Sequence, residues 1–212
     1  QNIRILISSI FEFASAAFEE FKELDLDEKH LLVRNFFPFI AVLDSEYRKL
    51  KHLPDQKSLV FSSYSTYIDH CTVEKLLSGS PAVMNNRDDA QRFVSAFLDG
   101  DVQQNRMRML RWNPSEDEYI ALLGICFWSL DKVTVSEKVH QIADNYRRMI
   151  FLELDGLYRQ KMGIGEFASR MGEAMLFVEA IQSSFLEMRT KMGMLKLMDI
   201  IGEEYLLAEL HL

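Results

Sequence analysis

A dense run of apolar side chains between residues 31 and 43 is the feature that most constrains the fold of this chain. Asp25 precedes it and Glu28 follows three residues later, a pattern that caps the free backbone amides of a helix N-terminus. Beyond that cap the apolar residues occupy more than one helical face, which is typical of a helix threaded through the middle of a domain. Pro38 removes one backbone donor and favours a kink. The apolar members are Leu31, Leu32, Val33, Phe36, Phe37, Phe39, Ile40, Val42 and Leu43.

The segment before the cap has an amphipathic pattern. Phe11, Ala14, Phe18 and Phe21 recur at helical spacing, and charged residues such as Glu12, Glu19, Glu20 and Lys22 lie between them. This spacing predicts a helix with one buried stripe and one solvated face. We therefore expect one helix to end and a second, central helix to begin near Asp25.

The rest of the chain is predicted to be helical, with one exception at residues 54–68. There, β-branched and aromatic residues alternate with Ser after the turn residues Pro54 and Asp55, which predicts a short hairpin. The sequence Asn113-Pro114-Ser115-Glu116 is typical of a helix start and leads into an apolar segment, Tyr119 to Trp128. Further helices are expected from Asp88 or Asp89 through Leu98, from Ser136 to about Met162, from Phe167 to Leu197 and from about Tyr205 to Leu212, with Gly163 and Gly165 as a break and Asp99 to Gln104 as a link.

Bulk composition limits the function classes. The 212 residues are 48% hydrophobic, enough for one substantial core. The formal net charge of -8 argues against direct binding of a phosphate backbone, which needs clustered Lys and Arg. Two cysteines, Cys71 and Cys126, are too few for a disulfide framework and suit a reducing compartment. No apolar run is long enough to predict a membrane span.

No motif predicts catalysis, a metal site or a cofactor. Gly163-x-Gly165-x-x-Ala168 superficially matches a dinucleotide loop, but that loop must follow a strand, whereas this one follows a predicted helix and is better explained by helix-capping glycines. His70 and Cys71 are neighbours and point in different directions, without metal-ligand spacing. A small helical enzyme that acts on lipids would need a general base in a cleft, and we identify none. We therefore expect no enzyme activity and no cofactor.

Three features leave alternatives open. The 15 Phe and 11 Met residues are explained either by core packing, which composition favours, or by an adaptable apolar cavity. Arg48 follows the apolar helix, where it either binds an anion or forms a salt bridge with Asp44, four residues earlier. At the C-terminus, Leu206, Leu207 and Leu210 share a helical face, which either seals the core permanently or docks reversibly.

A family resemblance bears on these alternatives. The positions of Phe21, Leu24, Glu28, Lys29 and Leu32 match F-x-x-L-x-x-x-D-Q-x-x-L-L, with Glu and Lys in place of Asp and Gln. This pattern resembles the signature of nuclear receptor ligand-binding domains. The segments NPSEDEYIALLGICFWSL and GEFASRM are also similar to later helices of that family, especially divergent nematode receptors of the lineage of hepatocyte nuclear factor four and the retinoid X receptor.

The resemblance implies an all-α fold, a three-layer antiparallel helical sandwich with one short β-hairpin. It implies that residues 1–212 form a single ligand-binding domain in which the first helix of the family is missing and which contains no DNA-binding domain. DNA would be contacted only through that absent domain. The protein would act in the nucleus, and no membrane is expected as a partner.

The resemblance also implies a small hydrophobic ligand, such as a fatty acid. Arg48 falls where related receptors place the arginine that anchors a fatty-acid carboxylate, which makes an anion as good an explanation as the Asp44 salt bridge. We expect Phe18, Phe37 and Val42 to line the same site. The bulk of Phe36, Phe37 and Phe39 keeps a filled interior open as the alternative.

The implied partner is a coregulator helix. Leu206, Leu207, Glu209 and Leu210 match the family's activation helix, in which Glu209 forms half of a charge clamp, and Arg34 matches a basic residue that ends a preceding helix. The expected clamp lysine falls on Ala16, a departure that puts coactivator recruitment in doubt. Dimerisation as a homodimer or heterodimer is expected through the helix that carries Met171, Met175, Phe177, Val178 and Ile181. The alternative function is a ligand-independent helical interaction or dimerisation domain.

Overall fold

The computed structural model describes residues 2–55, 59–61, 67–68, 88, 92, 100, 103–130, 133–161 and 164–197. Of the helix predicted from Asp88 or Asp89 through Leu98 the structure describes residues 88 and 92, and the predicted C-terminal helix from Tyr205 to Leu212 lies outside these ranges. Within the described residues no helix combines the length and apolar character required to cross a membrane.

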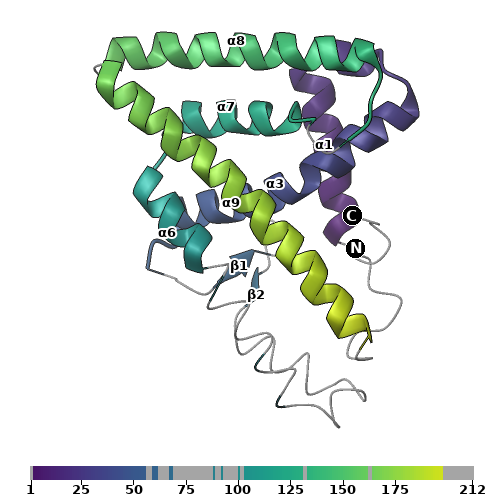
Figure 1. Ribbon diagram of the computed structural model, residues 1–212, viewed down its shortest axis with the longest axis vertical. Coiled ribbons are helices and arrows are strands. Elements are labelled where there is room, and N and C mark those ends of the chain that lie inside the picture. Colours follow the sequence, from purple (N-terminus) through teal and green to yellow (C-terminus); the bar gives the residue numbers. More distant parts are fainter. Residues whose placement is uncertain are drawn as a thin grey trace. The chain divides into compact units, whose positions relative to one another are not determined.

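The chain divides into two compact units. The first unit comprises Gln1–Asp44 and Trp112–Glu179, and the second comprises Ser45–Arg111 and Ala180–Leu212. Figure 1 shows two long helices, α3 (Leu26–His52) and α9 (Ile164–Leu197). Each of them contributes residues to both units.

The N-terminal part of the first unit contains α1 (Asn2–Ala17), the short α2 (Glu19–Lys22) and the start of α3. The amphipathic stripe predicted through Phe21 is interrupted, because Phe18 has extended backbone dihedrals (φ -129°, ψ 109°) and separates α1 from α2. The predicted cap before the central helix is confirmed: the Glu28 amide donates to Asp25 Oδ1 at 2.9 Å. Pro38 lies inside α3, which continues through it.

Two further helices of the first unit, α7 (Glu116–Phe127) and α8 (Glu137–Lys161), lie side by side (Figure 1). Ser115 caps α7 reciprocally: its Oγ accepts from the Glu118 amide at 3.3 Å, and its own amide donates to Glu118 Oε2 at 2.7 Å. Ser136 Oγ accepts from the Val139 amide at 3.4 Å at the start of α8. Helix α8 ends at Lys161 and α9 begins at Ile164, so the predicted division into two helices is confirmed, whereas Gly165, predicted as part of the break, lies inside α9.

The second unit contains the predicted hairpin. Strand β1 (Val60–Phe61) pairs antiparallel with β2 (Tyr67–Ile68), with Val60 opposite Ile68. Helix α6 (Gln103–Trp112) was not expected from the sequence, which predicted a link over its first residues. The described residues therefore form helices and one two-stranded hairpin, as the sequence predicted.

An aromatic cluster fills the interior of the first unit. The ring centroid of Phe127 lies 5.1 Å from that of Phe18, 5.3 Å from that of Phe36 and 5.0 Å from that of Trp128. Tyr146 stacks on Trp128 at 5.2 Å. Such ring pairs contribute beyond simple area burial, and the core interpretation of the Phe residues is confirmed here. We define the aromatic cluster as Phe13, Phe18, Phe21, Phe36, Phe127, Trp128 and Tyr146.

Candidate functional site

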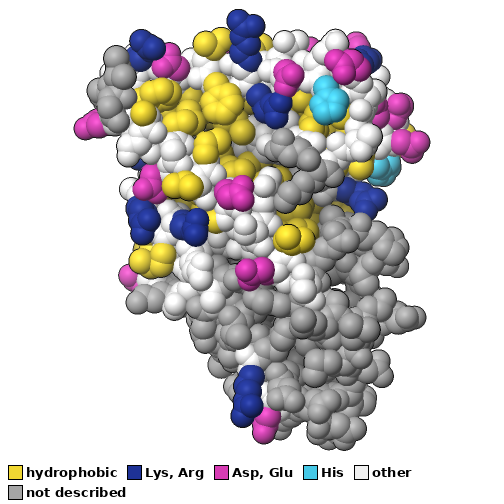
Figure 2. Space-filling model, in the orientation of Figure 1, with side chains coloured by type: hydrophobic (Ala, Val, Ile, Leu, Met, Phe, Trp, Pro, Cys, Tyr) yellow, Lys and Arg dark blue, Asp and Glu magenta, His cyan; other side chains and the backbone are white. Residues whose placement is uncertain are grey.

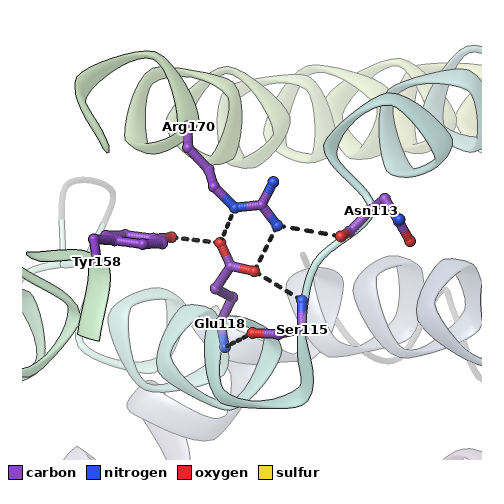
Figure 3. A network of polar contacts seen from close by, with 5 residues as sticks. All are labelled: Asn113, Ser115, Glu118, Tyr158 and Arg170. Atoms are coloured by element: carbon purple, nitrogen blue, oxygen red, sulfur yellow. Dashed lines mark hydrogen bonds and ion pairs between the residues drawn. The ribbon is translucent and has the colours of Figure 1, made fainter. Parts of the chain in front are cut away.

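The first unit contains a buried carboxylate whose oxygens are fully engaged (Figure 3). Glu118, in the first turn of α7, is 4% exposed. Arg170 of α9 binds both of its oxygens side on, with Nη2 2.6 Å from Oε2. The Tyr158 hydroxyl, from α8, donates to Oε1 at 2.6 Å, and the Ser115 amide donates to Oε2. One side chain thus ties together three helices of this unit.

The charge of Glu118 follows from these contacts. Burial raises the pKa of Glu118, but hydrogen bonds from Arg170, Tyr158 and the Ser115 amide outweigh it and lower the pKa to about 2. The pKa of the Tyr158 hydroxyl is raised by burial and by its hydrogen bond to Glu118. A carboxylate held ionised, with both oxygens occupied, has no free position for a reacting group. The Glu118 network positions helices.

The second unit contains buried charges with fewer partners. Glu46 and Lys49 lie one turn apart on α3 and are 3% and 0% exposed, and Arg106 of α6 is 1% exposed. Lys49 Nζ donates to Glu46 Oε1, and Arg106 Nη2 donates to the Pro54 carbonyl at 2.8 Å. We call Glu46, Lys49 and Arg106 the buried charge cluster.

Several polar atoms of this cluster have no hydrogen-bond partner among the described residues. They are Nε and Nη1 of Arg106 and Oε2 of Glu46. Burial raises the pKa of Glu46, although Lys49 and Arg106 oppose the shift. Burial likewise lowers the pKa of Lys49, against the attraction of Glu46. Each member of the pair therefore loses more by leaving water than it regains from its partner.

The residues predicted to bind ligand occupy different environments. Phe18 is part of the aromatic cluster of the first unit, which gives it a packing role. Phe37 is buried and Val42 half-buried, both on the first-unit part of α3. Arg48 is half-buried on α3 in the second unit, directly before Lys49 of the buried charge cluster. Their role in ligand binding stays a prediction.

The predicted coregulator surface is described on one side only. Leu26, His30 and Arg34 succeed one another at intervals of four along α3, so they share one helical face, and all three are exposed, with Leu26 at 65%. Ala16, where the family places its clamp lysine, is exposed at the end of α1. The predicted activation-helix residues Leu206, Leu207, Glu209 and Leu210 lie outside the described residues.

The predicted dimerisation residues lie on the first-unit part of α9. Met171 and Met175 pack against a buried cluster of the same chain formed by Ile125, Leu154 and Tyr158. Val178 is half-buried. Figure 2 shows hydrophobic side chains lying between charged ones on the surface in view. The exposed large hydrophobic side chains of the first unit include Ile120, Met149, Leu152 and Leu176. They lie on several helices and do not single out α9, so dimerisation through α9 stays a prediction.

Sequence reasoning missed the residues of both polar arrangements. Glu118 had a local signal, because the spacing Ser115-x-x-Glu118 is that of a capping box, but nothing near it indicated Arg170, 52 positions away. Arg106 had no signal at all, since Arg is almost never fully buried unless it is paired.

Comparisons with known proteins show which family this chain is similar to. A family model described as the ligand-binding domain of nuclear hormone receptor matches residues 3–198. Nuclear hormone receptor family member nhr-43 of Caenorhabditis elegans is 27% identical over 198 residues, which cover 85% of this chain and 43% of that protein. The High zinc activated nuclear receptor protein of the same species is 23% identical over 185 residues, covering 85% and 44%. The chain spans less than half the length of these two relatives.

A solved structure shows the same fold. The Ultraspiracle ligand binding domain from Drosophila melanogaster superimposes with a TM-score of 0.66 at 17% sequence identity, covering 97% of this chain and 74% of that one. The helical sandwich predicted from the sequence is thereby confirmed.

Proposed function

This chain belongs to the nuclear hormone receptor family as a ligand-binding domain, and on that premise we propose that it is a ligand-regulated module that recruits coregulators. Membership implies a regulator of transcription, in a family whose members are not enzymes. The proposal adds a small hydrophobic ligand, such as a fatty acid, and a coregulator helix as partners. The match of the family model along residues 3–198 is the observation that carries it.

The exposed stripe on α3 supports the coregulator part of the proposal. Leu26 offers an apolar contact, and Arg34 offers a cation to the carbonyl end of a docked helix, where positive charge is favoured. With Ala16 in place of a lysine, Arg34 would be the main cation of this surface. The C-terminal Leu206, Leu207 and Leu210 would supply the apolar side of the switch, and Glu209 would bind the amide end of the coregulator helix.

The proposed mechanism is a shift between two populations. A ligand that binds more tightly when residues 203–212 are docked shifts the equilibrium constant between the docked and undocked states, at saturation, by the ratio of its two affinities. The docked surface then binds the coregulator helix. No bond is made or broken in this cycle.

Peptide binding tests the proposal. Fluorescence anisotropy of a labelled LxxLL peptide should show tighter binding when oleate is present. Arg34→Ala should weaken that binding about threefold to fivefold, as expected for the loss of one charge at a helix terminus. Arg148→Ala removes an equally exposed arginine from α8 and serves as the matched control. A peptide affinity that changes neither with oleate nor with the Arg34→Ala substitution would contradict the proposal.

The aromatic cluster favours a second candidate, a ligand-independent interaction domain. Its rings fill the interior of the first unit, which leaves packing rather than ligand to stabilise that unit. Hydrogen exchange of residues 203–212 separates the two candidates. Protection that increases with oleate supports the ligand-regulated module, whereas protection that is high and constant supports the second candidate.

We also propose that the protein acts in the nucleus as a homodimer or heterodimer through α9, with DNA bound by another part of the receptor. Substitution of Val178 by Arg should lower the dimer fraction measured by analytical ultracentrifugation. Substitution of exposed Glu179 by Arg changes charge at the next position and serves as its control.

A further inference from the structure

We infer that the buried charge cluster of the second unit binds the oxyanion head group of the ligand, with Arg106 as its anchor. This inference rests on the proposed function, because it assigns the head group of the ligand that the domain is proposed to bind. It concerns a residue on α6, distinct from the Arg48 position that the family resemblance indicates.

The charges of the cluster do not balance. Among the described residues of the cluster one acid, Glu46, faces two cations, Lys49 and Arg106, and its ion pair is with Lys49, which leaves one excess positive charge in a buried position. A guanidinium stays protonated at any physiological pH. A buried charge is retained at acceptable cost only when it is paired. An anion next to Arg106 would complete the cluster.

The hydrogen bonds of Arg106 are incomplete as well. A guanidinium carries five N–H groups. That of Arg106 donates from Nη2 to the Pro54 carbonyl. Its Nε and Nη1 have no acceptor among the described residues. Buried polar groups without a partner are rare in folded proteins, and a carboxylate is the strongest partner for a guanidinium. Unused donors on a permanent cation therefore point to an oxyanion.

The anchor is held in place by its surroundings. The Pro54 carbonyl fixes one end of the guanidinium, and the neighbouring Asn105 ties α6 to α9 through a 3.1 Å hydrogen bond from its side-chain amide to Ser184 Oγ. A fixed anchor loses little conformational entropy when the ligand binds. A water molecule would fill the vacant hydrogen bonds but would leave the charge, so it is a weaker explanation than an anion. Water or a ligand hydroxyl suits the remaining atom, Glu46 Oε2, which needs a donor.

Matched probes and variants test the assignment. Titration calorimetry compares oleate, uncharged oleyl alcohol and inorganic phosphate on the wild type, Arg106→Met and Arg111→Met. Arg111 is an exposed arginine of the same helix and provides the control. The wild type and Arg111→Met should bind oleate on the order of tenfold or more tightly than oleyl alcohol, and Arg106→Met should lose that preference.

The outcomes separate this inference from the proposed function. Equal binding of oleate and oleyl alcohol by the wild type, unchanged in Arg106→Met, would overturn the anchor and leave a lipid-binding domain. If the wild type binds neither lipid, both the anchor and the proposed lipid-binding function are overturned. Phosphate binding that requires Arg106 would support an oxyanion site that takes its anion from solution. If Arg106→Met does not fold, Arg106→Lys keeps the charge without the planar fork and should bind oleate with intermediate affinity.

Discussion

The two units treat buried charge in opposite ways. In the first unit the carboxylate of Glu118 receives hydrogen bonds from Arg170, Tyr158 and the Ser115 amide, and it is matched by one cation. In the second unit Nε and Nη1 of Arg106 have no acceptor among the described residues, and the neighbouring Glu46 is paired with Lys49. Burial is similar in the two places, so the difference lies in the partners.

This difference separates structural charge from functional charge. A fully satisfied network rigidifies the helices that it joins, whereas an incomplete one stays costly until something completes it. Glu118 therefore serves the fold, and Arg106 is available to a ligand. Variants on the two sides should behave differently, and four predictions test that contrast in order of expected size.

The largest effect should come from Glu118→Ala. It leaves Arg170 and the Tyr158 hydroxyl without their shared acceptor, and breaking one side of a buried ion pair costs about 3–5 kcal/mol in the free energy of unfolding. Urea denaturation followed by circular dichroism measures it. Glu116→Ala, in the same first turn but exposed, should cost less than about 1 kcal/mol. Similar losses in the free energy of unfolding for the two variants would contradict the structural role of Glu118.

Acid should produce the next largest effect. The pKa of Glu118 is lowered to about 2 in the folded state, from 4.5 as the ordinary value. Its contribution is therefore complete above about pH 4.5 and is lost as the pH falls toward 2, a loss of about 3 kcal/mol. Urea denaturation at successive pH values should show this loss in the wild type and not in Glu118→Gln. Parallel curves for the two proteins would contradict the prediction.

Tyr158→Phe should have a smaller effect. It removes one hydrogen bond to an ionised carboxylate and leaves Arg170 and Ser115 in place, so we expect a loss of about 1.5–2 kcal/mol in the free energy of unfolding. Thermal and urea denaturation both measure it. A double variant with Glu118→Gln should lose less than the sum of the two single changes, because both act on one network. Strict additivity would show that the two side chains act independently.

The smallest effect should come from Arg106→Met without ligand. The change loses the hydrogen bond to Pro54 but also removes the excess positive charge among the described residues of the cluster, so the free energy of unfolding should change by less than about 1 kcal/mol in either direction. Urea denaturation of delipidated protein provides the measurement. A loss as large as that of Glu118→Ala would show that Arg106 is already satisfied by the chain and would erase the contrast between the units.

Local signals in the sequence predicted the elements well. The Asp25 cap, the helix start before Glu116 and the division between α8 and α9 depend on residues within a few positions, and the structure confirms each. Helix α6 was missed because its sequence, QQNRMRMLRW, is mostly polar and carries only a weak apolar pattern. The break at Phe18 was missed because a buried Phe continues the helical stripe although its backbone is extended.

The polar arrangements could not be predicted in the same way. The Glu118 and Arg170 pair joins residues 52 positions apart, and Arg106 reaches Pro54 across another 52. Such pairs depend on how helices pack, which local spacing does not encode. Arg48 was predicted from its position after the apolar helix and from the family resemblance, and neither indicated the charges at Lys49 and Arg106.

The most direct measurement is the rise in melting temperature that oleate produces in three delipidated proteins: the wild type, Tyr158→Phe and Arg106→Met. Ligand that binds the folded state stabilises it by an amount that increases with the logarithm of its affinity. The wild type and Tyr158→Phe should gain equally, although Tyr158→Phe starts from a lower melting temperature, and Arg106→Met should gain little. An equal rise in all three proteins would contradict the assignment of Arg106 to the ligand.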